Sequence, residues 1–328
     1  MSAESHATAS VRPVPRRLDD VPGWFWPVDQ LLFTRLLEGQ SAAGATGDLL
    51  ELGTYLGRSA ILIGRHLRAS ETFTICDLFD SEAPDEANAD EMATSYRKTL
   101  TRQAFEANYL AFHPTLPDIV QAPTSVLADG GVPAESCRFV HIDASHLYEH
   151  VAGDIQVARA ALGKSGVVVF DDYRSAHTPG TAAAVWEAVF AHGLRPVCLS
   201  PEKFYGTWGD PAAVQEMLLR HDWEQEGWSL ARDTIAGFEV LRFFGDGRHL
   251  ADPEIGAGIG AGVSAGVGAE AVPPAGARSE AGPVAESRLR PASAPRSKGR
   301  RIALDLLPPV ATRAVRRRLQ AARDRRTR

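Results

Sequence analysis

The chain has 328 residues, of which 44% are hydrophobic and 23% are charged, and its formal net charge is −6. This composition is that of an ordinary globular protein. No apolar run reaches the ~20 residues that span a bilayer. The polar segment 1–20 lacks the apolar stretch of a secretory signal. Three widely spaced cysteines argue against a disulfide framework and against a structural zinc site. We therefore expect a cytoplasmic protein.

Charge and composition divide the chain. Residues 296–328 carry 12 basic and 2 acidic side chains, which leaves 23 basic and 39 acidic ones in residues 1–295. An acidic body is unsuited to a broad nucleic-acid-binding face. Between residues 255 and 295, 24 of 41 residues are Gly, Ala or Pro, and no aromatic residue follows Phe244. Such a segment is typical of a disordered linker. We predict a flexible N-terminus (1–22), one domain (23–250), a disordered Gly/Ala/Pro-rich linker (251–300) and a basic tail (301–328).

The domain shows alternating helix and strand signals. Continuous apolar runs predict strands that are buried on both faces, and a period near 3.6 predicts helices. In chain order, we expect a helix at 27–37, strands at 48–52 and 72–76, and helices at 59–67 and about 90–110. A strand at 118–121, a strand at 139–142, a helix at 146–162, a strand at 166–170, a helix at 181–191 and a strand at 238–244 follow. This pattern predicts an α/β fold, a doubly wound and mostly parallel sheet with helices on both faces.

The helical segment 90–110 lies in a long insertion between two predicted strands. It could be a substrate lid, a dimer surface or a packed helical excursion. The basic tail could form a short amphipathic helix that contacts an anionic surface or a partner, or it could be a solvated tail. The sequence leaves the oligomeric state open, and a homo-oligomer is possible on this reading.

Ligands of such sheets bind beyond the carboxyl ends of the strands. The first strand is followed by a turn that contains Gly53 and Gly57, and glycines permit a tight turn and a close backbone approach. The next helix begins near Arg58, where its free N–H groups and the Ser59 hydroxyl could hold an anionic group such as a carboxylate. A plain strand–helix turn is the alternative. The turn lacks the third glycine of a dinucleotide fingerprint, which disfavours a nicotinamide dehydrogenase.

Acidic residues follow the later strands. Asp77 closes the second strand, where an acid commonly binds ribose hydroxyls; a solvated loop acid is the alternative. Asp143, Asp171 and Asp172 end two neighbouring strands, so their charges would repel unless a hard divalent cation joins them. The alternative is a helix-capping role for one of them and solvent exposure for another. His146 follows near the start of a helix, where a neutral imidazole could accept a proton from a substrate hydroxyl.

The stretch Leu49-Leu-Glu-Leu-Gly-Thr-Tyr-Leu-Gly-Arg-Ser-Ala60 resembles the first motif of class I S-adenosylmethionine-dependent methyltransferases. With the later acids, residues 23–244 are similar to the metal-dependent O-methyltransferases of the catechol type, and closer to the branch that methylates macrolide sugars and related natural products. The resemblance implies a Rossmann-like sheet of seven strands. It covers about two thirds of the chain and excludes the tail.

The resemblance also implies roles for individual residues. Glu51, Gly53 and Gly57 would shape the pocket for the methionine part of the cofactor, with Tyr55 and Ser59 near its sulfonium and carboxylate. Asp77 would bind the ribose. Asp143, Asp171 and Asp172 would hold Mg²⁺ or Mn²⁺, although the third ligand of the catechol type is usually Asn. His146 stands where that type has its basic Lys. The loop after the third strand, with Thr124 and Ser125, would border the adenine.

The expected function is therefore methyl transfer from S-adenosylmethionine to a hydroxyl of a small molecule or natural product, with a divalent metal. Two alternatives remain. The first is a metal-independent methyltransferase on the same fold, in which the three acids are merely hydrogen-bonded. The second is a non-catalytic cofactor-binding or scaffold protein whose basic tail recruits a partner.

Overall fold

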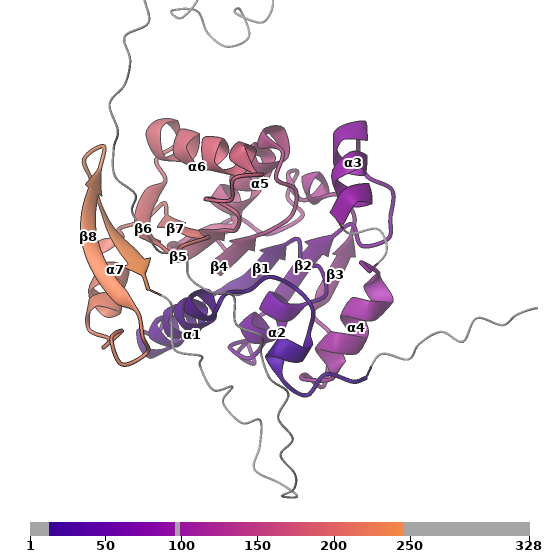
Figure 1. Ribbon diagram of the computed structural model, residues 1–328, viewed down its shortest axis with the longest axis horizontal. Coiled ribbons are helices and arrows are strands. Elements are labelled where there is room, and N and C mark those ends of the chain that lie inside the picture. The colour runs from indigo at the N-terminus through magenta and orange to yellow at the C-terminus, as the bar shows by residue number, and fades with distance from the viewer. Residues whose placement is uncertain (1–12, 96–98, 246–328) are drawn as a thin grey trace, which may run out of the picture. The chain divides into compact units, whose positions relative to one another are not determined.

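The computed structural model describes residues 13–95 and 99–245 (Figure 1). The predicted linker (251–300) and basic tail (301–328) lie outside the described residues, as does segment 1–12. Leu18 and Val21 are buried in the core, next to a short 3₁₀ helix, η1 (Leu18–Asp20). Packing therefore begins a few residues before the predicted domain boundary at residue 23.

A single sheet runs through the described residues and confirms the α/β prediction. Its strand order is β3-β2-β1-β4-β5-β7-β6-β9-β8. The strands are β1 (Asp48–Leu52), β2 (Phe73–Asp77), β3 (Asp118–Gln121), β4 (Cys137–Ile142), β5 (Leu162–Phe170), β6 (Arg195–Leu199), β7 (Phe204–Thr207), β8 (Ser229–Ile235) and β9 (Phe238–Phe244). β1 to β5 pair in parallel, and β7 lies antiparallel between β5 and β6. The strand order reverses between β1 and β4, which is where doubly wound sheets bind ligands.

The sheet has nine strands, and the prediction of seven was wrong in this respect. β9 corresponds to the strand predicted at 238–244, whereas β6, β7 and β8 have no counterpart among the predicted strands. β8 and β9 form a hairpin. β9 pairs in parallel with β6, and β8 pairs antiparallel with β9. The hairpin extends the sheet at the end far from β3, so it leaves the reversal point between β1 and β4 unchanged.

Helices cover both faces of the sheet (Figure 1). One face carries α1 (Pro27–Ala42), α2 (Arg58–Gly64), α4 (Arg102–Leu110) and α7 (Ala212–Leu219), and the other carries α5 (Tyr148–Ala161) and α6 (Pro179–Ala191). All six residues of β4 are buried, as expected for a strand between two helical layers. None of the helices in the described ranges has the length and apolar character that crossing a membrane requires.

The segment predicted as one long helix over 90–110 forms two helices. α3 (Glu86–Ser95) borders a cavity, whereas α4 packs into the core through Phe105 and Tyr109. Thr101 separates them because its side chain caps α4 by accepting a hydrogen bond from the Ala104 N–H at 3.2 Å. α4 is therefore a packed helical excursion, whereas α3 contributes to the wall of the cavity.

Candidate active site

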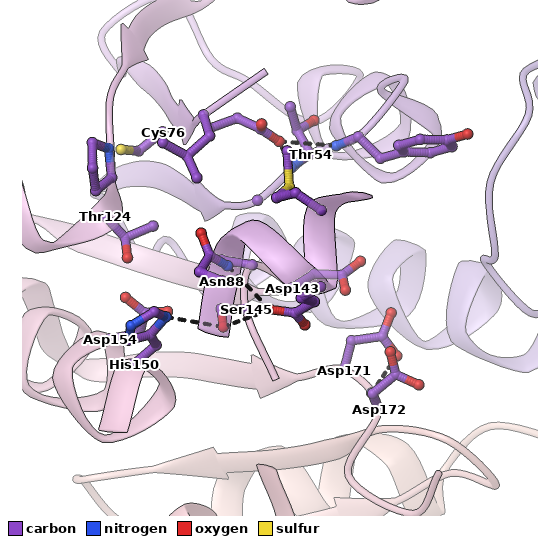
Figure 2. A pocket seen from close by; sticks show the side chains of 18 of the residues that line it. Thr54, Cys76, Asn88, Thr124, Asp143, Ser145, His150, Asp154, Asp171 and Asp172 are labelled. Atoms are coloured by element: carbon purple, nitrogen blue, oxygen red, sulfur yellow. Dashed lines mark hydrogen bonds between the residues drawn. The ribbon is translucent and has the colours of Figure 1, made fainter. Parts of the chain in front are cut away.

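A cavity of about 820 Å³ opens at the carboxyl ends of β1, β2, β4 and β5. The residues that line it include the last residue of β2, Asp77, and the residues directly after the other three strands: Gly53, Asp143 and Asp171. Residues of α3, of α5, of the loop after β3 and of the segment 22–26 also line it. Figure 2 shows Cys76, Thr124 and Asp154 at one end of the cavity and Asp171 and Asp172 at the other. The cavity thus occupies the place that the strand order predicts for a ligand.

Backbone hydrogen bonds continue past the strand ends and fix these residues. The Asp143 N–H donates to the Leu52 carbonyl at 2.7 Å, and the Asp171 N–H donates to the Ile142 carbonyl at 2.9 Å. The Gly53 N–H likewise donates to the Cys76 carbonyl at 2.8 Å. Each residue is held by the neighbouring strand, so the positions of the acids relative to the turn after β1 follow from the sheet itself.

The two glycines of the turn after β1 are required by the protein's own packing. Gly53 has φ of 77° and Gly57 has φ of 93°, a region that favours glycine. A Cβ on Gly53 would lie 2.1 Å from the Asp143 carbonyl oxygen, and one on Gly57 would lie 2.9 Å from the Phe105 ring. The predicted tight turn is present. The close approach at Gly53 is to the end of β4, and the one at Gly57 is to α4.

Asp77 organises the same turn from the end of β2. Its Oδ2 accepts hydrogen bonds from the Thr54 and Tyr55 N–H groups at 2.7 and 3.1 Å, and its Oδ1 accepts one from the Phe79 N–H at 2.6 Å. Burial raises the pKa of Asp77, although the three N–H groups favour its charged form. A carboxylate has about four acceptor sites, and the three N–H groups use three of them. Asp77 can therefore hold the turn and still accept a hydrogen bond from a hydroxyl in the cavity through Oδ1.

The other predicted cofactor residues divide between the cavity and the core. Tyr55, Ser59 and Ser125 line the cavity, and the Tyr55 hydroxyl lies 2.9 Å from the Thr99 hydroxyl. Glu51 is instead fully buried beneath the turn, where its Oε1 lies 2.7 Å from Nδ1 of His141. Glu51 therefore does not line the cavity and supports only the turn after β1.

The three predicted metal ligands converge at one end of the cavity. A metal ion could be held by ligand atoms of Asp143, His146 and Asp172, which lie within 4.8 Å of one another, and a second such group combines His141, Asp143 and Asp171. Burial and the neighbouring charge of Asp171 raise the pKa of Asp143 well above its usual value. The acids thus repel one another, as the sequence predicts.

Lys203, just before β7, is a charged neighbour of these acids that no sequence pattern indicated. Its ammonium group forms an ion pair with Oδ2 of Asp171, and its side chain is only 1% exposed. The Asp171 Oδ1 accepts a hydrogen bond from the Asp172 N–H at 2.8 Å. Both carboxylate oxygens of Asp171 therefore already have a donor.

His146 lies between two carboxylates in the loop before α5. Its Nδ1 is 2.7 Å from Oε1 of Glu91, and its Nε2 is 2.9 Å from Oδ2 of Asp172. Burial lowers the pKa of His146, but Asp172 and Glu91 outweigh it and raise the pKa to about 10. The imidazole therefore carries a proton in this structure, whereas the sequence analysis expects a neutral ring. Glu91 comes from α3, and an acid of that helix gave no signal in the sequence.

Comparison with known proteins agrees with this geometry. Residues 50–173 match the model of a family described as "Methyltransferase domain". No curated protein gives a significant match. Among solved structures, the chain is similar to the O-methyltransferase NovP, with 19% identity over 56% of this chain and 81% of that chain and a TM-score of 0.42. It is also similar to the calicheamicin methyltransferase CalS11, with 19% identity, coverage of 56% and 79%, and a TM-score of 0.42.

A putative O-methyltransferase from Klebsiella pneumoniae has 16% identity to the chain, with coverage of 61% of this chain and 93% of that chain and a TM-score of 0.43. The matched family region runs from β1 to the residue after Asp172 and so contains the turn after β1, Asp77 and all three strand-end acids. Residues 50–173 thus resemble a methyltransferase domain.

Proposed function

We propose that the protein transfers a methyl group from S-adenosylmethionine to a hydroxyl oxygen of a small molecule, with the help of a divalent cation. The observation that carries this proposal is the grouping of Asp143, His146 and Asp172. Asp143 and Asp172 line the cavity that the turn after β1 also borders, and His146 lies beside them but does not line it. Such a grouping combines cation ligands and a proton-accepting side chain beside the site of methyl transfer.

The residues of the cavity suit the cofactor. Asp77 retains acceptor capacity toward ribose hydroxyls at the end of β2. Tyr55 and Ser59 also line the cavity, and the methionine part would lie beside them. Ser125 and Thr124 border the opposite end, beyond β3. These residues would bind and orient the cofactor so that its methyl group faces the acids.

The acids also suit a hard cation. Asp143, Asp171 and Asp172 supply carboxylate oxygens, the ligands that Mg²⁺ and Mn²⁺ prefer. The raised pKa of Asp143 reflects burial and mutual repulsion, and a cation would relieve the repulsion. Since Lys203 and the Asp172 N–H occupy Asp171, we expect Asp143 and Asp172 to contribute most to binding. A bound metal would lower the pKa of the acceptor hydroxyl and fix its approach.

His146 is the group that would take the acceptor's proton. Its Nε2 faces Asp172, whereas Glu91 holds its Nδ1 and so orients the ring. In the structure the imidazole is protonated because both carboxylates favour the charged form. It can act as a base only when another cation balances the negative charges of Asp172 and Asp143, because these charges raise the pKa of His146. The proposed cation and the proposed base therefore depend on each other.

The test is calorimetric titration with S-adenosylmethionine and S-adenosylhomocysteine, with and without Mg²⁺ after EDTA treatment, followed by a screen of hydroxylated acceptors. We expect micromolar binding of a cofactor form and methyl transfer that EDTA abolishes. His146→Ala should lower turnover by about 10²- to 10⁴-fold at similar cofactor affinity, and Asp143→Asn should remove metal dependence or activity. Full activity of both variants would contradict the proposed site.

One observation favours a second candidate, metal-independent methylation on the same fold. The Lys203 ammonium already compensates one of the three acids, so the cluster carries less negative charge than its sequence suggests. Under this alternative, the acids would be hydrogen-bonded groups and EDTA would leave turnover unchanged. A metal-free preparation with full activity would establish it.

A further inference from the structure

Trp24 and Trp26 expose their indole rings beside the cavity. Trp24 is 66% exposed and Trp26 is 53% exposed. Among the exposed large apolar side chains of the described ranges, these are the two that line the cavity. Phe25, between them, is buried, as expected where successive side chains of an extended segment point to opposite sides. The segment before α1 therefore presents two indole rings to the cavity.

Phe25 places this segment at the end of the cavity that holds the acids. The ammonium nitrogen of Lys203 lies 5.6 Å from the centre of the Phe25 ring, and the same ammonium pairs with Asp171. Trp24 and Trp26 flank Phe25 in the chain and line the cavity there. They therefore border the region in which the acceptor hydroxyl would lie under the proposed function.

The lining of the cavity is strongly acidic. Among the described residues it includes nine Asp or Glu residues and one Arg or Lys residue, Arg58. Arg58 is bound to the backbone, since its Nε donates to the Val21 carbonyl at 2.6 Å and its Nη2 donates to the Asp19 carbonyl at 3.1 Å. Such a lining repels anions, and phosphate recognition relies on Arg or Lys. A phosphorylated acceptor therefore fits this cavity poorly.

Glu202 is an acid at this end that does not belong to the predicted metal ligands. It lines the cavity, and its backbone carbonyl accepts a hydrogen bond from the Tyr173 N–H at 3.0 Å, which holds it beside the loop after β5. Its Oε2 lies 3.4 Å from the Ser175 hydroxyl. The neighbouring Lys203 ammonium is directed to Asp171, and no ion pair between described residues includes Glu202. Glu202 therefore retains acceptor capacity toward a cationic group of a ligand.

Indole faces and carboxylates attract the same kind of ligand group. An ammonium group is attracted to the face of an aromatic ring, most strongly to that of Trp. A carboxylate forms a charge-assisted hydrogen bond with the same group. We propose that the acceptor carries a protonated amine, which Trp24, Trp26 and Glu202 bind while the acceptor hydroxyl faces the acid cluster. This inference rests on the proposed function.

Three probes separate attraction of charge from stacking of a ring. 2-Phenylethylamine, 2-phenylethanol and phenylacetate share one ring and are cationic, neutral and anionic at neutral pH. Ligand-observed NMR titrations measure their dissociation constants with S-adenosylhomocysteine and Mg²⁺ at saturation, so that the metal ligands are occupied. We expect the wild-type protein to bind the amine at least about fivefold more tightly than the alcohol. Phenylacetate should bind most weakly.

Variants assign the preference to the three side chains. Trp24→Ala and Trp26→Ala should each weaken binding of the amine at least about threefold. Glu202→Gln should weaken it about two- to fivefold and leave the alcohol unchanged, because the alcohol carries no charge. Phe190→Ala removes an exposed ring, and Asp129→Asn removes an exposed acid; neither residue lines the cavity. Both controls should bind all three probes as the wild type does.

The outcomes separate the inference from the proposed function. Equal affinity of the wild-type protein for the amine and the alcohol would overturn the inference and leave the indoles as a surface for neutral rings. No measurable binding of the amine, tighter binding of phenylacetate, or an amine preference that Glu202→Gln and the two Trp variants leave unchanged would overturn it as well. Calorimetry of the same samples reports S-adenosylhomocysteine binding. If this ligand binds and the probe ranking fails, only the inference is lost. If no cofactor form binds, the proposed function fails and the inference falls with it.

Discussion

Nε2 of His141 lies 3.1 Å from the ammonium nitrogen of Lys203, deep beneath the cavity. Burial and this ammonium lower the pKa of His141 well below its usual value. The ring is therefore neutral: Nε2 accepts from Lys203, and Nδ1 donates to Oε1 of Glu51 at 2.7 Å. Behind the strand-end acids, Glu51, His141 and Lys203 thus form a hydrogen-bonded chain, and Lys203 connects this chain to Asp171.

The first prediction concerns Lys203. Lys203→Met should destabilise the protein by about 3–5 kcal/mol, because removing one partner of a buried ion pair leaves an uncompensated charge. Here Asp171 loses its ion-pair partner, and the buried Asp29 loses a nearby positive charge that lowers its pKa. Urea unfolding measures the change. Lys164→Met, at an exposed position of β5, is the matched control and should lie within about 0.5 kcal/mol of the wild type. Equal destabilisation by Lys203→Met and Lys164→Met would contradict a stabilising role for the buried ion pair of Lys203 and Asp171.

The second prediction concerns the turn after β1. Gly53 and Gly44 have similar positive φ values of 77° and 70°, but a Cβ on Gly44 would meet nothing within 4 Å. Gly44→Ala should therefore report backbone strain alone, about 1–3 kcal/mol. Gly53→Ala should cost about 1–3 kcal/mol more, because its Cβ overlaps the Asp143 carbonyl. It should also weaken S-adenosylhomocysteine binding, whereas Gly44→Ala should not. Calorimetry and thermal unfolding measure both effects, and similar behaviour of the two variants would rule out the packing argument.

The third prediction concerns acid stability. Glu71 is bound by Arg138 at 2.9 and 3.0 Å. Burial raises the pKa of Glu71, but hydrogen bonds from Arg138 and Arg68 outweigh it and lower the pKa to about 2, from 4.5. A lowered folded-state pKa stabilises the protein above pH 4.5, and the contribution disappears as the pH falls through 2.

Glu71→Gln should accordingly cost about 3 kcal/mol at pH 7. The difference from the wild type should diminish between pH 4.5 and pH 2, as followed by urea unfolding across this range. Glu216→Gln is the control, since its partner Arg220 lies in an exposed pair. That variant should change stability by less than about 1 kcal/mol at any pH. If Glu71→Gln lowered the free energy of unfolding equally at every pH, the lowered pKa of Glu71 could not be the source of its contribution to stability.

The fourth prediction concerns the acid cluster. If Asp143 and Asp172 hold a cation, then Asp143→Asn and Asp172→Asn should each weaken Mn²⁺ binding at least about tenfold, a loss of about 1.4 kcal/mol. Electron paramagnetic resonance of free Mn²⁺ measures this without turnover. Asp129→Asn should bind Mn²⁺ as the wild type does. Weak and equal binding by all three variants would favour the metal-independent alternative.

The strands that form the site could be predicted because they are continuous apolar runs that end in a polar residue. Val167–Phe170 is buried and wholly apolar, and Leu49–Leu52 is buried with Glu51 as its one polar residue. The rule that parallel strands end at the same edge of a sheet then placed Asp143 beside Asp171. The β6–β7 hairpin was missed because Pro196, Pro201 and Lys203 interrupt its apolar pattern.

The electrostatic partners of the site could not be predicted. Glu91 bonds His146 from 55 residues away, and Lys203 meets His141 from 62 residues away. Such separations are far longer than the repeat of a helix or a strand. No local sequence pattern therefore predicts these contacts. For the same reason, the protonated state of His146 follows from the fold and not from the motif that contains it.

The backbone hydrogen bonds that tie Asp143 to Leu52, and Asp171 to Ile142, have a consequence for protein engineering. They make the end of the cavity that holds the acids part of the sheet, which changes little when surface segments are replaced. The remaining wall, from α3 and the segment 22–26, is attached by side-chain contacts such as Glu91 with Ser145 at 2.9 Å. Libraries aimed at new acceptors should therefore vary residues 22–26 and 84–92 and leave the strand ends intact.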